Sequence, residues 1–173
     1  MNALEGAAGV APDLVVPLVG FRQWRLVDGE LKSMYDDALW VDGAITAHCD
    51  RGHALAEVPV KDCTCGAYAY YDVVPLTASV ATADLVAGAV VAWGRVEAHP
   101  YGMRSKHARI VALELPLSRK AKRRALLRVA ERLEVPAVPH RSLKRTALQH
   151  GEVLRPALRP KKTVTRAANV WSR

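Results

Sequence analysis

The sequence predicts a mainly β fold with a C-terminal α-helix: a small curved antiparallel sheet or barrel with a zinc clip, followed by a basic helix and tail. Three observations support this fold class. Short β-rich runs joined by turn residues fill the first two thirds of the chain, Cys and His residues cluster within that part, and Lys and Arg concentrate after residue 118. A length of 173 residues suits one ordinary domain with an extension.

The first strands are predicted around Asp-Gly pairs. Residues 21–27 and 30–34 flank Asp28-Gly29, and this dipeptide between two such runs favours a two-residue hairpin turn because both positions tolerate positive φ. Segment 39–47 contains a second Asp-Gly pair. We therefore expect another pair of short strands there.

The longest predicted hairpin lies later in the chain. Segments 85–98 and 103–115 are separated by His-Pro-Tyr-Gly, a turn sequence, and the second segment alternates polar and apolar residues. Gly88 and Gly94 interrupt the first segment. They predict bulges or bends of a strongly curved sheet.

The core is expected to consist mainly of Val, Ala and Leu, because aromatic residues make up 6% of the chain and include one Phe. Trp24, Trp40 and Trp93 fall inside predicted strands and are assigned to the core, where large side chains supply volume. The alternative is a stacking platform for bases. For the tyrosines at 68, 70 and 71 both interpretations stay open.

A metal site is predicted from a cluster of four residues. Cys49, His53, Cys63 and Cys65 follow the pattern C-x3-H-x9-C-x-C, with Gly66 directly after it. Three thiolates and one imidazole form a usual tetrahedral set for structural zinc, and four protein ligands leave no open position for catalysis. His48 is a competing ligand. Buried free thiols or a redox pair are the alternatives to metal binding.

The C-terminal third predicts a basic amphipathic helix. Residues 119–135 contain no Gly or Pro, and Ser118 suits an N-cap. Residues 1–118 carry 9 Lys and Arg against 14 Asp and Glu, whereas residues 119–173 carry 16 against 3. This asymmetry is typical of a folded body joined to an arm that meets a polyanion. A solvated arm that only keeps the protein dispersed is the alternative.

The chain is thereby divided into four parts. They are a flexible leader (1–14), a β-rich domain expected to bind zinc (15–117), the basic amphipathic helix (118–135) and a basic, Pro-punctuated arm (136–173). The end of the arm, from residue 156, is expected to be disordered when free.

The expected function is non-enzymatic binding of DNA or RNA, in an accessory or regulatory role. No nucleophile motif, phosphate-binding glycine loop or carboxylate pair with a positioned His is recognisable, so no catalytic residue is assigned. Phosphate contacts are expected from a set of basic side chains, namely Arg119, Lys120, Lys122, Arg123, Arg124, Arg128, Lys144, Arg145, Lys161 and Lys162.

A rival function is a protein-interaction factor, such as a phage protein acting on a host machine. Its docking face would be the apolar side of the helix, formed by Leu126, Leu127, Ala130 and Leu133. A structural subunit of a larger assembly is a third option. The longest apolar stretch is too short to span a membrane and the N-terminus lacks a basic leader, so we expect a cytoplasmic protein.

Four motifs stand out between residues 20 and 115. They are Phe21-x2-Trp24-Arg25, Cys49-x3-His53, Cys63-x-Cys65-Gly66-Ala67-Tyr68-Ala69 and Val86-x-Gly88-x4-Trp93-Gly94-x-Val96-x2-His99. In this combination the region resembles a group of small uncharacterised proteins from actinobacteria and their phages. The resemblance implies that residues 20–115 are one unit, in a bacterial or phage cytoplasm, without implying an activity.

Overall fold

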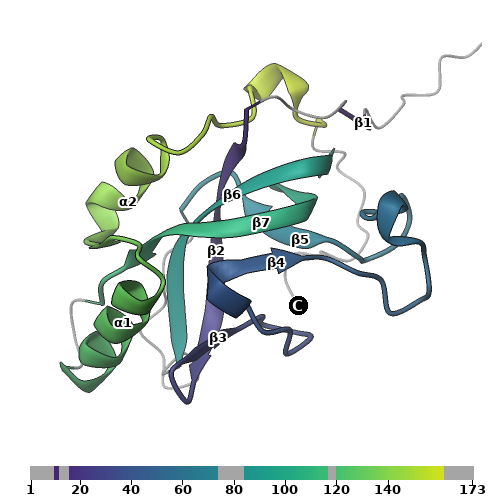
Figure 1. Ribbon diagram of the computed structural model, residues 1–173. Helices are drawn as coiled ribbons and strands as arrows, with labels where there is room; N and C mark the ends of the chain where they lie inside the picture. Colours follow the sequence, from purple (N-terminus) through teal and green to yellow (C-terminus); the bar gives the residue numbers. More distant parts are fainter. Residues whose placement is uncertain (1–9, 12–15, 74–83, 117–119, 162–173) are drawn as a thin grey trace, which may run out of the picture.

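The computed structural model describes residues 10–11, 16–73, 84–116 and 120–161. Within them, eight strands form one curved sheet, against which helices α1 (Lys120–Arg132) and α2 (His140–Ala147) pack (Figure 1). The mainly β fold with a C-terminal helix is therefore confirmed. The strands are β1 (Val10–Ala11), β2 (Leu18–Val27), β3 (Glu30–Lys32), β4 (Ala44–Thr46), β5 (Ala67–Tyr70), β6 (Leu85–Ala98), β7 (Gly102–Glu114) and β8 (Ala137–Val138), with short 3-10 turns η1 (Val41–Gly43), η2 (Leu55–Glu57) and η4 (Pro156–Leu158).

The sheet is built around the long β6–β7 hairpin. β2 pairs antiparallel with β6, while β4 and β5 follow one another along the opposite edge of β7. β5 also pairs with β2, but only at the register position Phe21↔Tyr70. The curved sheet is therefore closed between β5 and β2 by this single pair and by no continuous ladder. The sheet is thus curved rather than a true barrel. It is mixed because β8 runs parallel to β7.

The predicted hairpins have different outcomes. Asp28 and Gly29 both have positive φ and join β2 to β3 in a two-residue turn, as predicted. Asp42 and Gly43 also have positive φ, but they belong to η1, and within segment 39–47 the part before them forms only an isolated bridge at Leu39. The second strand pair was therefore predicted wrongly, because the same dipeptide serves a 3-10 turn.

The β6–β7 hairpin matches its prediction closely. Its turn is closed by the His99 amide, which donates to the Gly102 carbonyl oxygen at 2.8 Å. The pairing register shifts between Ala89 and Val90 and again between Trp93 and Val96. These irregularities fall beside the two glycines that predicted them and bend the hairpin into the curve of the sheet.

The two faces of the sheet carry separate hydrophobic clusters. On β6, Val90 belongs to one cluster while its neighbours Ala89 and Val91 belong to the other, because successive strand residues point to opposite faces. The first cluster contains Trp24 and Trp40, whose rings meet edge to face with centroids 5.3 Å apart. These two tryptophans are core residues, as predicted.

Each helix covers one of these clusters. From α1, Leu126, Val129 and Ala130 enter the first cluster, and from α2, Leu143 and Ala147 enter the second. Segment 136–161 is therefore packed onto the sheet through β8 and α2, whereas the sequence treated it as an arm outside the domain. Ser118 lies outside the described residues, as do residues 162–173 of the tail.

The predicted leader is described only at residues 10–11. These two residues form β1, which pairs with Val96 and Glu97 of β6. The local sequence has no periodicity that would predict this strand, because the strand forms only by pairing with the edge of β6, which is distant in the chain.

Candidate metal centre

All four predicted ligands lie on the connection between β4 and β5, residues 47–66, which we call the metal loop. After β4, a turn closes with the Gly52 amide donating to the Cys49 carbonyl oxygen at 3.1 Å. A second turn closes with the Cys63 amide donating to Val60 oxygen, also at 3.1 Å. Each turn presents one Cys, and both turns face the same point.

The ligand atoms are gathered closely enough to hold one ion. The atoms of Cys49, His53, Cys63 and Cys65 all lie within 4.8 Å of one another. Cys49 Sγ lies 3.1 Å from His53 Nδ1 and 3.6 Å from Cys63 Sγ. Around a tetrahedral zinc ion, with bonds of about 2.0 Å to nitrogen and about 2.3 Å to sulfur, such atoms would be about 3.5 to 3.8 Å apart. The donor set therefore fits a metal ion in number, chemistry and spacing.

The remaining details of the loop agree with a C-x-C half-site. Cys63 and Cys65 are buried while Thr64 between them is exposed, so both sulfurs turn inward and the intervening residue turns outward. The Val60 amide donates to Cys65 Sγ at 3.4 Å. His48, the competing ligand, lies outside the cluster with its Nδ1 3.4 Å from the Thr46 carbonyl oxygen.

The protein environment shifts the pKa values of two of the thiols in opposite directions. Burial acts to raise the pKa of Cys49, but hydrogen bonds from the His53 and Arg51 amides and from the side chains of His53 and Cys63 outweigh it and lower the pKa to about 6. Burial raises the pKa of Cys65, partly offset by the Val60 amide. Cys49 thus favours the thiolate form, which is the form that binds metal.

A buried arginine holds the metal loop to the sheet. Arg104 on β7 is 3% exposed and donates to the carbonyl oxygens of Cys63, Cys65 (3.0 Å) and Val60 (3.3 Å). Its charge is paired with Glu97 on β6, at 2.5 Å. The guanidinium therefore fixes the backbone that carries two of the four ligands, a role resembling the outer-shell support of known metal sites.

The sequence did not single out Arg104, although a signal was present. Arg104 shares its parity with Ala108 and Ile110, so the period-2 pattern of the strand places it on the same face as these two core residues. An arginine at a core-facing position indicates a buried, paired charge, since an unpaired one would be too costly.

The predicted phosphate-binding residues are distributed unevenly. Arg119 and Lys162 lie outside the described residues. Lys122 donates to the Leu85 carbonyl oxygen, and Lys144 lies 3.5 Å from the Asp72 carboxylate. Six others are exposed, with no ion pair to the described part of the chain: Lys120, Arg123, Arg124, Arg128, Arg145 and Lys161.

The exposed cations of α1 form one outer face. Lys120, Arg124 and Arg128 are spaced by four and so lie in a row along the helix. This row is opposite the face that Leu126 and Val129 bury. α2 adds Arg141, exposed and not singled out by the sequence reasoning. In Figure 1 both helices lie on one side of the molecule and the metal loop with η2 lies on the other, so the two features are separate.

The predicted apolar docking face is not available on the surface. Leu126, Ala130 and Leu133 are buried in the protein's own core at 0%, 4% and 8% exposure, and only Leu127 is exposed. The amphipathic pattern that suggested this face also describes a helix packed on its own sheet, which is how the structure uses Leu126, Ala130 and Leu133.

Comparisons with family models, with curated proteins and with solved structures find no match for this chain. Within the described residues, no helix has both the length and the apolar character needed to cross a membrane.

Proposed function

We propose that this protein binds nucleic acid through the outer face of α1, with α2 extending the contact surface, and that a structural zinc ion stabilises the body that carries these helices. The observation that carries the proposal is the row of exposed cations along α1, which form no ion pair with the described residues, on a helix whose other face is packed on the sheet. A fixed row of charges suits a polyanion better than a mobile tail does, because less conformational entropy is lost on binding.

The charge of the helical segment supports this proposal. Residues 120–161 contain 12 Lys and Arg against 3 Glu, a net charge of +9. Two of these cations are paired, Arg132 with Glu30 at 2.9 Å and Lys144 with Asp72 at 3.5 Å, whereas the row along α1 has no such partner in the described chain. Contacts from such a row bind and position the phosphate backbone, and they read no sequence.

Zinc is the proposed ion because three thiolates and an imidazole are the soft and borderline ligands that it favours in tetrahedral sites. Four protein ligands fill the coordination sphere, which favours a structural role. The bound ion would close the connection between β4 and β5, whose described residues contain the short 3-10 turn η2 and no strand. It would act together with Arg104, which holds the same backbone to the sheet.

The proposal is tested by fluorescence anisotropy with labelled short single-stranded DNA, duplex DNA and RNA. Two variants of the full chain are compared. The helix variant carries Arg123→Gln, Arg124→Gln and Arg128→Gln, and the matched control carries Arg51→Gln, Lys61→Gln and Arg109→Gln, which are exposed cations outside the helices. Both variants lose the same charge, so a difference between them reports the position of the cations.

We expect the wild-type affinity to fall by about a thousandfold between about 50 and about 200 mM salt if six phosphates are contacted. The helix variant should lose about 2 to 3 from the slope of log affinity against log salt, and the control should retain it. Equal losses in both variants, or no salt-sensitive binding by the wild type, would refute the proposal.

A further inference from the structure

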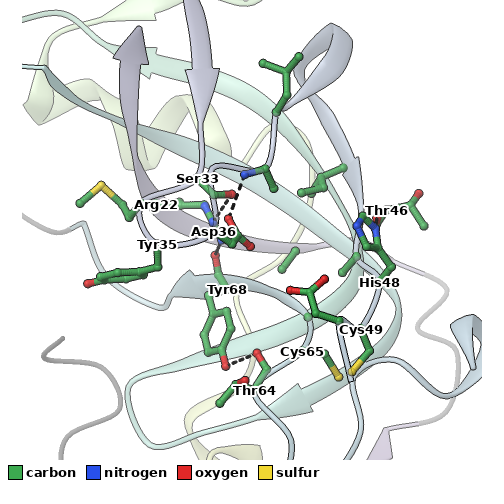
Figure 2. Close-up of a pocket in the computed structure, with 18 of the residues that line it drawn as sticks. Arg22, Ser33, Tyr35, Asp36, Thr46, His48, Cys49, Thr64, Cys65 and Tyr68 are labelled. Atoms are coloured by element: carbon green, nitrogen blue, oxygen red, sulfur yellow. Dashed lines mark hydrogen bonds between the residues drawn. The ribbon is translucent and has the colours of Figure 1, made fainter. Parts of the chain in front are cut away.

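A pocket of about 930 Å³ opens beside the metal loop. It is lined by β2 at Arg22, by segment 33–41, by β4, by the parts of the metal loop that hold its three cysteines, and by β5. Figure 2 shows Tyr35 toward one side of this pocket and Cys49 and Cys65 toward the other. Its volume falls within the range of about 300 to 1,000 Å³ that is usual for small-molecule sites.

The pocket wall carries a positive charge, Arg22, which makes no ion pair within the described residues although Asp36 lies near enough to act on it electrostatically. Arg22 donates to the Tyr68 carbonyl oxygen at 2.7 Å and to Ser33 Oγ at 3.0 Å, and both acceptors are neutral (Figure 2). Its Nε is buried with no hydrogen-bond partner in the described structure. Burial lowers the pKa of Arg22 to about 10, against the opposing effect of Asp36, so the guanidinium is charged at neutral pH.

The rim of the same pocket is apolar and aromatic. It is lined by Tyr35, Leu39 and Val41, whose side chains are 77%, 42% and 60% exposed, respectively. Beneath the rim, the Trp40 ring lies under Arg22, with the guanidinium carbon 5.1 Å from the ring centroid. Large apolar side chains gathered around a concave site favour a ligand with an apolar body.

From this combination we propose that the pocket binds a small organic anion, with one acidic group directed to Arg22 and a flat apolar body against the rim of Tyr35, Leu39 and Val41. A polyanion is disfavoured because Asp36 and Asp50 also line the pocket. The pocket lining includes no residue of α1 or α2, so this site is separate from the proposed nucleic-acid surface.

A matched pair of fluorescent probes tests the proposal. 1-Anilinonaphthalene-8-sulfonate has an aromatic body with one negative charge, and N-phenyl-1-naphthylamine has the same body without the charge. We expect the folded full chain to bind one molecule of the sulfonate at saturation, at least tenfold more tightly than the neutral amine. That difference is the size expected for a hydrogen bond to a charged group.

Variants locate the binding. Arg22→Gln should weaken sulfonate binding at least tenfold and leave amine binding within twofold, whereas Arg22→Lys should keep most of the preference for the sulfonate. Tyr35→Ala should weaken both probes, and since Tyr35 is exposed the change should leave the fold intact. The helix variant is the control for adventitious binding of the anion to α1 and should bind both probes as the wild type does.

Three results would overturn the proposal: equal affinity of the wild type for both probes, unchanged sulfonate binding by folded Arg22→Gln, or loss of that binding in the helix variant. If Arg22→Gln fails to fold, two results still test the proposal: the wild-type preference for the sulfonate over the amine, and the weaker binding of both probes by Tyr35→Ala. If either result is not observed, the proposal is refuted.

Discussion

Replacing Arg104 with Met should be among the most damaging single changes in the protein. The substitution keeps a long side chain of similar reach but removes the guanidinium. Within the described residues, Glu97, 17% exposed, then keeps one ion-pair partner, His99 at 3.3 Å. The carbonyl oxygens of Cys63 and Cys65 lose the guanidinium donor, and that of Val60 keeps only the Cys63 amide. The metal loop is thereby released from the sheet.

The expected loss follows from the burial of this pair. Removing one partner of a buried, hydrogen-bonded ion pair costs about 3 to 5 kcal/mol, because the other charge stays behind unpaired. A domain of this size has a total free energy of unfolding of about 5 to 15 kcal/mol. Arg104→Met should therefore remove a large share of the stability, and adding Glu97→Gln should restore part of it.

Urea unfolding followed by tryptophan fluorescence measures this loss, since Trp24 and Trp40 are buried in the core. Arg109→Met on the same strand is the control. Arg109 is exposed, so its replacement should change the free energy of unfolding by less than about 0.5 kcal/mol. The reasoning is refuted if Arg104→Met costs no more than Arg109→Met, or if the double variant is less stable than Arg104→Met alone.

Three further predictions concern packing, metal and surface charge. Leu126→Ala should lower the free energy of unfolding by about 2 to 5 kcal/mol, whereas Leu127→Ala on the exposed side should cost less than about 0.5 kcal/mol; equal effects in urea unfolding would contradict the packing of α1. A strong chelator should lower the midpoint temperature of thermal unfolding of the wild type and leave that of Cys63→Ser unchanged. If the chelator does not change the wild-type midpoint, the protein holds no structural metal ion. Asp72→Asn should cost less than about 1 kcal/mol, because its pair with Lys144 is exposed, and a larger loss in thermal unfolding would contradict that view.

Features that depend on local sequence were predictable. The Asp28-Gly29 turn follows from the φ values those residues tolerate, and the β6–β7 hairpin follows from two β-rich segments around a turn. The four ligands could be named from residue type and clustering alone, because few other side chains bind metals as Cys and His do.

Features that depend on long-range packing were not predictable in the same way. The amphipathic pattern of α1 defines an apolar face but not what covers it, and here the sheet covers it. The Asp42-Gly43 pair has the backbone conformation expected of it, yet its neighbours form a 3-10 turn because the pairing of β4 is with β7, more than sixty residues away in the chain. The pocket at Arg22 arises from five separate segments, and no local pattern marks it.

The most direct test of the account is zinc analysis of the purified full chain by elemental mass spectrometry, combined with X-ray absorption at the zinc edge. The account predicts one zinc per chain, with three sulfur neighbours at about 2.3 Å and one nitrogen at about 2.0 Å, and loss of the ion in Cys63→Ser. A chain that is folded without bound metal, or a zinc ion bound equally well by Cys63→Ser, would contradict it.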